Sequence, residues 1–430
     1  MLEHCRRAAV RAARGTRSAH TYATTLAAHD ARALVPAVHA ALARAPEHST
    51  LLYAISRDIP PDVLADIVYT LRKDRARTHL GVLAASLPVG ESVMHSVAFA
   101  ALTHAVPFRS TISGGVRIAV GRWPTQKELW QRGTDMYARE LDSGADWRAL
   151  WGRENVDARL PASLEDAQQV GTVLLASDGR PQGVAEGLDA RFPHASIAGL
   201  IGARTPFATG REYTLIADGL DGQDGIFESG ALGVALPEHL RVETQFAGLE
   251  PIGAPLAITG ARGNIISTLE HANAAQQFLR LVTHGRRSPG TDTRTLASHV
   301  SKDDEFVVAI LEGEQPALVA RLNSGHPMRG TLSIDTTCEL GVPGARMQLY
   351  RQTPAPPAPL PRTPQIVFLA AGAADAPVQD ADGRGQLELP HTMYVASDGG
   401  WLGRGATQNA PLSRHTHMCS VAHARLIVHL

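Results

Sequence analysis

The stretch "STLLYAISRDIPPDVLADIVYTLRKDRARTHLGVLAAS", Ser49 to Ser86, contains two kinds of segment that together indicate the fold class. Residues 49–56 and 78–86 are short apolar runs, as expected for buried strands. Residues 60–73 begin with two prolines and predict a helix. Its buried face is expected to carry Val63, Leu64, Ile67, Val68 and Leu71. A strand followed by a helix and a second strand favours a layered α/β architecture.

The same order of segments recurs about 120 residues further along the chain. Residues 170–178 predict a strand, 181–195 a helix and 196–204 a second strand. Residues 92–102 predict a further strand of the first copy, and two more are expected in the second copy, at 212–218 and 229–237. We therefore expect an internal strand-helix-strand-strand duplication within one α/β domain, with helices on an outer face.

The remaining segments predict a second domain that is richer in strands. A helix is expected at residues 26–45 before the first copy, and another at 273–285. Beyond it lies an expected antiparallel group, whose strands are 305–311, 316–323, 330–340 and 345–352. A proline-rich connection at 353–365 precedes a strand that resumes this sheet, and "QDADGRGQLELP" (379–390) has the character of a polar insert. The overall expectation is α/β (α+β), with two layered sheet-and-helix domains at 26–240 and 241–430.

Composition excludes several classes of protein. The 430 residues are 44% hydrophobic and carry 41 Lys and Arg against 42 Asp and Glu, a net charge of -1 that argues against a nucleic-acid partner. No apolar run reaches the roughly 18 residues of a membrane span. The three cysteines form no Cys-x-x-Cys pair, which indicates a reducing compartment.

The first segment differs from this neutral average. Residues 1–25 contain five arginines and one acidic residue, and a helix here would place Arg7, Arg11 and Arg14 on one face. Such a segment is typical of a mitochondrial transit peptide, which would direct the protein to the matrix. The alternative is a solvated N-terminal extension on a cytoplasmic protein.

Glycine and proline gather in "GLEPIGAPLAITGARGNIIS", Gly248 to Ser267, as in phosphate-binding loops. It has neither the Lys-Ser/Thr pair of a Walker loop nor Gly-x-Gly-x-x-Gly. We interpret it as the start of the second domain, with polar groups facing the space between the domains. The ligand-binding residues predicted here are Gly253, Pro255, Thr259, Gly263 and Asn264.

The ordered turns and strands resemble those of the FIST family. The resemblance covers residues 48–430. In a FIST N-terminal-like domain the matching segments are "IAGLIGARTPFATGREYTLIADG" and "GVALP". In a FIST C-terminal-like domain they are residues 248–282, 330–351 and 394–429. It implies an intracellular sensory or adaptor protein that binds an amino-acid-like ligand or a peptide between its domains. The resemblance also leaves open a substrate-recognition subunit related to the F-box FIST proteins. We find no F-box pattern before residue 49, so we expect a fungal or other eukaryotic type without an F-box.

The C-terminal segment offers the strongest chemical candidate. If "RHTHMCSVAHARLIVHL" is a strand, His415, His417 and Cys419 share one face, and imidazole and thiolate are zinc ligands. The alternative is a histidine-rich strand in which Cys419 is a small buried hydrophobe. A hydrolase or metal-dependent enzyme therefore stays open beside the sensor, but no nucleophile motif is present, so we predict no catalytic residue and no cofactor.

Two further features have two interpretations each. Asp58 and Asp178 follow the matching strands, where α/β proteins often bind ligands, but either could instead cap the helix that follows. Four tryptophans between residues 123 and 151 could form a binding surface or a small core under a long connection.

Overall fold

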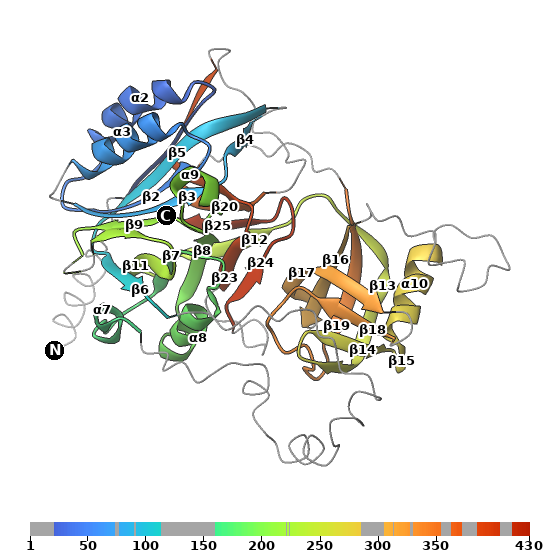
Figure 1. The fold of residues 1–430 in the computed structure, drawn as a ribbon. Helices are drawn as coiled ribbons and strands as arrows, with labels where there is room; N and C mark the ends of the chain where they lie inside the picture. Colours follow the sequence, from blue (N-terminus) through green and yellow to red (C-terminus); the bar gives the residue numbers. More distant parts are fainter. Residues whose placement is uncertain are drawn as a thin grey trace, which may run out of the picture.

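The computed structural model describes residues 21–73, 77–89, 92–112, 160–220, 222, 224–284, 305–312, 314–326, 330–353, 363–371, 385–404 and 415–430. Within these ranges the chain forms four β-sheets, three of which lie together while the fourth lies beside them (Figure 1). The class is mixed α/β, as predicted. Most of residues 1–25 and all four clustered tryptophans lie outside the described residues.

The first sheet is built around the stretch that predicted it. Strand β2 (Thr50–Ser56) lies parallel to β3 (Thr78–Ala84), and α3 (Pro61–Arg72) connects them. Strand β5 (Ser92–Leu102) is antiparallel to β2 and separates it from β1 (Tyr22–Ala28). The sheet is completed by β9 (Leu215–Asp218), β10 (Gly225–Phe227) and β21 (Gln386–Pro390), and β4 (Leu87–Val89) pairs with β5.

The second sheet has the same connectivity. Strands β7 (Thr172–Ser177) and β8 (Ser196–Ile201) are parallel and joined by α8 (Gln182–Arg191). Strand β11 (Ala231–Leu236) is antiparallel to β7 and separates it from β6 (Val106–Ser110). Strands β23 (Trp401–Arg404) and β24 (His417–Cys419) extend the sheet beyond β8. The two predicted copies therefore share one strand order, while their origin by duplication stays a prediction.

A third sheet repeats this strand order, which the sequence patterns did not indicate. Strands β20 (Gln365–Ala370) and β22 (Thr392–Ser397) are parallel. Strand β25 (Arg425–His429) is antiparallel to β20 and separates it from β12 (Arg241–Gln245). We expected β20 to resume the antiparallel group; it belongs instead to this separate sheet.

The fourth sheet contains the predicted antiparallel group. Its members are β13 (Leu249–Arg262), β14 (Ile265–Leu269), β15 (Ala272–Asn273), β16 (Phe306–Glu312), β17 (Gln315–His326), β18 (Thr331–Ile334) and β19 (Arg346–Gln352). Helix α10 (Ala274–His284) packs its apolar side on this sheet through Phe278 and Val282.

The first three sheets enclose one common core. Leu52 and Val82 from the first sheet, Leu174 from the second, and Phe368 and Leu426 from the third belong to the same buried cluster. The opposite face of the first sheet is covered by α2 (Leu34–Leu42) and α3, and that of the second by α7 (Ala162–Glu165) and α8. The predicted outer helices are therefore present on these two sheets.

Two segments differ from the expectation. Residues 22–28 form β1 rather than the end of a leader and the start of a helix; the helix begins only at Leu34, after a short 3₁₀ turn at Ala31–Ala33. The last residues of the expected polar insert form β21, which pairs with β1 because Leu387 and Leu389 alternate into a buried cluster.

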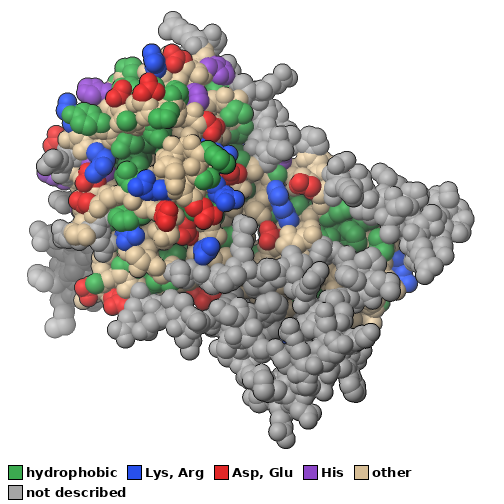
Figure 2. All heavy atoms as spheres, in the orientation of Figure 1, with side chains coloured by type: hydrophobic (Ala, Val, Ile, Leu, Met, Phe, Trp, Pro, Cys, Tyr) green, Lys and Arg blue, Asp and Glu red, His purple; other side chains and the backbone are tan. Residues whose placement is uncertain are grey.

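The predicted boundary at residue 240 falls between β11 and β12, and it stays a prediction. Strands from beyond it nevertheless complete both earlier sheets, since β21 pairs with β1 and β23 pairs with β8. Acidic and basic side chains are interspersed on the face drawn in Figure 2, which agrees with the balanced net charge. Among the described residues, no helix is both long enough and apolar enough to span a membrane.

Candidate ligand-binding site

The carboxyl ends of the parallel strands of the three sheets meet at one place. They are linked pairwise by three hydrogen bonds: Ala203 N to Leu83 O at 2.8 Å, Ala85 N to Ala396 O at 3.0 Å, and Ser397 Oγ to Ile201 O. In open α/β sheets, ligands bind at the carboxyl ends of strands. The polar side chains that follow these strand ends are therefore the first candidates for a site.

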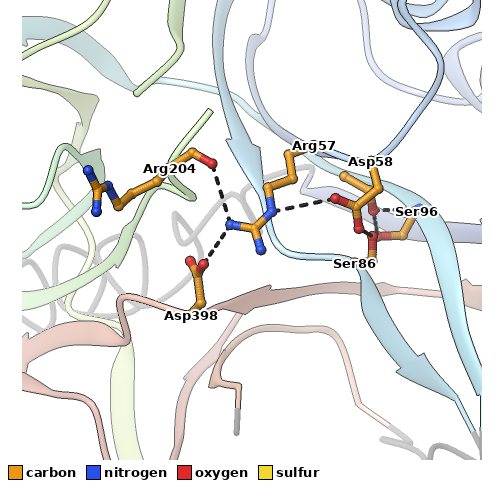
Figure 3. A network of polar contacts seen from close by, with 7 residues as sticks. Arg57, Asp58, Ser86, Ser96, Arg204 and Asp398 are labelled. Atoms are coloured by element: carbon orange, nitrogen blue, oxygen red, sulfur yellow. Dashed lines mark hydrogen bonds and ion pairs between the residues drawn. The ribbon is translucent and has the colours of Figure 1, made fainter. Parts of the chain in front are cut away.

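Arg57, the residue after β2, lies at this junction and contacts the other two sheets (Figure 3). Its Nη1 donates to Asp398 Oδ2 at 2.6 Å and to the carbonyl of Arg204 at 3.4 Å. Its Nε lies 3.5 Å from Asp58 Oδ1. One guanidinium thus connects the ends of β2, β8 and β22.

Serine hydroxyls lie at and behind the Asp58 carboxylate. Ser86 donates to Asp58 Oδ2, which fixes the carboxylate beside Arg57. Behind it, the hydroxyls of Ser56 and Ser96 lie 2.9 Å apart, and Ser56 also accepts from the Ser96 amide. Both serines are buried, Ser56 at the end of β2 and Ser96 within β5. We call Arg57, Asp58, Ser86 and Asp398 the strand-end site.

The charged groups of the strand-end site are open to solvent. The side chains of Arg57, Asp58 and Asp398 are 33%, 53% and 43% exposed. Burial works against the charge of Arg57, but its hydrogen bond to Asp398 and the charges of both aspartates outweigh this and raise its pKa. No interaction among the described residues uses Nη2 of Arg57, which leaves a donor for a bound group.

Neither of the two aspartates considered in the sequence is a helix cap. The N-cap residues of α3 and α8 are Pro60 and Pro181, and no side chain caps either helix. Asp58 instead faces Arg57, whereas Asp178 is buried and accepts from the amides of Arg180 and Gly230. Only Asp58 is therefore available to a ligand.

The ligand-binding residues predicted between 253 and 264 lie in β13 and in the turn into β14. Contrary to expectation, Asn264 is buried, and its amide donates to Ile334 O at 2.8 Å within the fourth sheet. Thr259 donates to Thr268 and accepts from the His271 amide. Gly253 and Gly263 adopt positive φ, and Pro255 O accepts from Arg346. The contacts seen for these residues are within the chain.

The structure does not assemble the proposed metal ligands His415, His417 and Cys419. His415 is turned toward Asp189, and the ring of His417 packs on Trp401 at 5.8 Å. Burial lowers the pKa of His417 to about 4 and raises that of Cys419 to about 12. Within the described ranges, no group of three or more His, Cys, Asp or Glu side chains could hold a metal ion.

The middle of the chain matches a known protein family. Residues 116–272 match the family model of the FIST N domain. The chain carries a FIST N domain. The resemblance to the FIST family is therefore confirmed for this part, which contains the second sheet's β7, β8 and β11 and supplies Arg204 to the junction. No curated protein matches the chain.

The FIST domain is associated with signalling and with the sensing of ligands. The strand-end residues Arg57, Asp58, Ser86 and Asp398 all lie outside the matched residues, and Arg57 contacts the matched part through the carbonyl of Arg204. Asp398 was not predicted from the sequence, although a signal for it is present. The tetrapeptide Ala-Ser-Asp-Gly occurs at 176–179, where we noted Asp178, and again at 396–399, where it ends β22.

Proposed function

We propose that this FIST protein is an intracellular sensor or adaptor that binds a small amino-acid-like ligand at the strand-end site. The observation that carries the proposal is the position of Arg57 between two exposed carboxylates, Asp58 and Asp398. An α-amino acid has the complementary charges, a carboxylate and an ammonium separated by one carbon.

The chemistry of the site favours a zwitterion over a simple anion. The three charges sum to one negative, because Arg57 contributes +1 and the two aspartates -2. A lone anion would compete with two carboxylates for one guanidinium, whereas a zwitterion brings its own ammonium to the aspartates. The ligand carboxylate would take the free Nη2 of Arg57, in a charge-assisted hydrogen bond.

The position of the site supports ligand binding between the two predicted domains. Arg57 and Asp58 belong to the range 26–240, whereas Asp398 belongs to 241–430. Residues 241–272 of the second range belong to the FIST N match, and we propose a FIST C-terminal-like domain for the remainder, of a type without an F-box. A peptide bound through its free terminus would use the same groups, but no described contact favours the enzyme or the ubiquitin-ligase alternative.

A thermal-shift and calorimetric screen tests the proposal. Free amino acids are compared with their N-acetyl and methyl-ester derivatives, each of which lacks one of the two charges. We expect binding of the free forms only, and a loss of about 10- to 100-fold in affinity with Arg57→Gln, the range for a charge-assisted hydrogen bond. Arg32→Gln is the matched control, because Arg32 forms an exposed ion pair with Asp62 on α3. Equal binding of the derivatives, or equal loss in both variants, contradicts the proposal.

For location, we propose mitochondrial import directed by the arginine-rich start, with cytoplasmic residence as the alternative. A cleaved leader would have to end before Tyr22, because β1 pairs with both β5 and β21. Residues 1–21 fused to a fluorescent protein should therefore enter mitochondria, and the same fusion with its five arginines changed to glutamine should not. A wild-type fusion that stays in the cytosol contradicts import.

A further inference from the structure

A fully exposed phenylalanine lies three residues beyond the junction. Phe207 is 104% exposed, on the single-turn helix α9 (Pro206–Thr209). It is the most exposed of the large hydrophobic side chains that the structure describes. Single exposed apolar residues are common on protein surfaces, so exposure by itself assigns no role.

Hydrogen bonds hold the loop that carries Phe207. The hydroxyls of Thr205 and Thr214, both buried, lie 2.7 Å apart, and Thr209 lies 2.7 Å from Thr214. The Thr205 amide also donates to Glu212 O at 2.8 Å, which closes the loop. The backbone that carries Phe207 is therefore held by hydrogen bonds, and a preorganised backbone reduces the entropy lost when a ligand binds.

The loop begins at the strand-end site. Arg204 accepts a hydrogen bond from Arg57 through its carbonyl, and the chain reaches Phe207 three residues later. Because Arg204 and Phe207 are three residues apart, their Cα atoms lie within about 11 Å of each other. The carbonyl that accepts from Arg57 and the residue that carries the exposed ring therefore lie on one short loop.

We propose that Phe207 is the apolar contact residue of the strand-end site, and that the ligands are α-amino acids with aliphatic or aromatic side chains. This inference rests on the proposed function. Arg57, Asp58 and Asp398 then bind the charged head group that all amino acids share, and Phe207 selects among side chains. Covering the ring removes from water an apolar surface that the free protein leaves exposed.

Calorimetric titrations with glycine, leucine and phenylalanine test the inference. The variants are Phe207→Ala, Arg57→Gln and Tyr69→Ala, the last a control because Tyr69 is 70% exposed on α3. We expect the wild type to prefer leucine and phenylalanine over glycine. Phe207→Ala should weaken the binding of these two by about 10-fold, the scale of a lost hydrophobic contact, while glycine binding is unchanged. Tyr69→Ala should change nothing.

The outcomes separate the two proposals. If glycine binds through Arg57 but leucine binds no better, or if Phe207→Ala has no effect, the role of Phe207 is overturned and the head-group site stands. If Phe207→Ala weakens all three ligands equally, the ring does not select side chains and the inference fails. If none of the three ligands binds, the proposed function falls, and this inference falls with it.

Discussion

Arg57 donates a hydrogen bond to Asp398 across 341 positions of the chain, at 2.6 Å. The bond joins the end of β2 in the first sheet to the end of β22 in the third. Because both side chains are partly exposed, the pair contributes little to stability. We interpret it as the resting state of a binding site.

Removal of this pair should affect ligand binding more than folding. Arg57→Gln and Asp398→Asn are each expected to change the free energy of unfolding by less than about 1 kcal/mol, the usual limit for exposed ion pairs. Urea denaturation of the two variants and of the wild type measures this. A loss of several kcal/mol in either variant would show that the pair is structural.

The buried ion pair between Arg404 and Asp189 should behave in the opposite way. Arg404 is 4% exposed, and its guanidinium donates to Asp189 at 2.8 Å and to the carbonyls of Phe192 and Ala195. Asp189→Ala removes this carboxylate from a buried guanidinium and should cost about 3–5 kcal/mol. Asp62→Ala, which breaks an exposed pair, is the control and should cost less than about 1 kcal/mol. Similar losses from the two substitutions would contradict the expectation.

Two glycines with positive φ should differ in their tolerance of alanine. A Cβ on Gly400, where φ is 90°, would lie 2.1 Å from Cys419 O, whereas a Cβ on Gly210, where φ is 75°, would have no atom within 4 Å. Gly210→Ala should therefore cost only the backbone strain, about 1 kcal/mol. Gly400→Ala should cost about 2–4 kcal/mol, because the clash with a backbone oxygen adds to that strain. Thermal denaturation compares them, and equal melting temperatures would argue against the close approach of β23 and β24.

His417 should make the protein sensitive to acid. Burial lowers its pKa to about 4, against 6.5 for an ordinary histidine, although the nearby Asp189 charge acts the other way. The folded state therefore favours the neutral ring, and the stabilisation is complete above pH 6.5 and is lost as the pH falls toward 4. The full effect on the free energy of unfolding is on the order of 3 kcal/mol. As the pH falls from 6.5 to 4, the free energies of unfolding of the wild type and of His417→Gln should converge. A constant difference between them would show that His417 does not titrate in this range.

Much of the fold could be predicted from local patterns. The alternation of apolar runs with an amphipathic helix identified β2, α3 and β3 and their counterparts in the second sheet, because each of these elements buries its own apolar residues. Strand β1 was missed because its sequence, "YATTLAA", is rich in alanine and threonine. Its burial depends on β5 and on β21, and β21 comes from the far end of the chain.

The strand-end site could be predicted only in part. Asp58 was considered because it follows a strand, but a local pattern does not show that Asp398 and Arg204 lie beside Arg57. These contacts depend on how three sheets pack around one core. Asn264 shows the converse error, since a polar residue in a glycine turn suggested a ligand, whereas its amide is bonded inside the fourth sheet.

The most direct test of the central claim is a crystal structure of the protein with bound leucine. We predict that the ligand carboxylate accepts a hydrogen bond from Arg57 Nη2 and that its ammonium lies between Asp58 and Asp398. Leucine bound elsewhere, for example beside Thr259 and Gly263 in the fourth sheet, with the Arg57–Asp398 pair unchanged, would contradict the account.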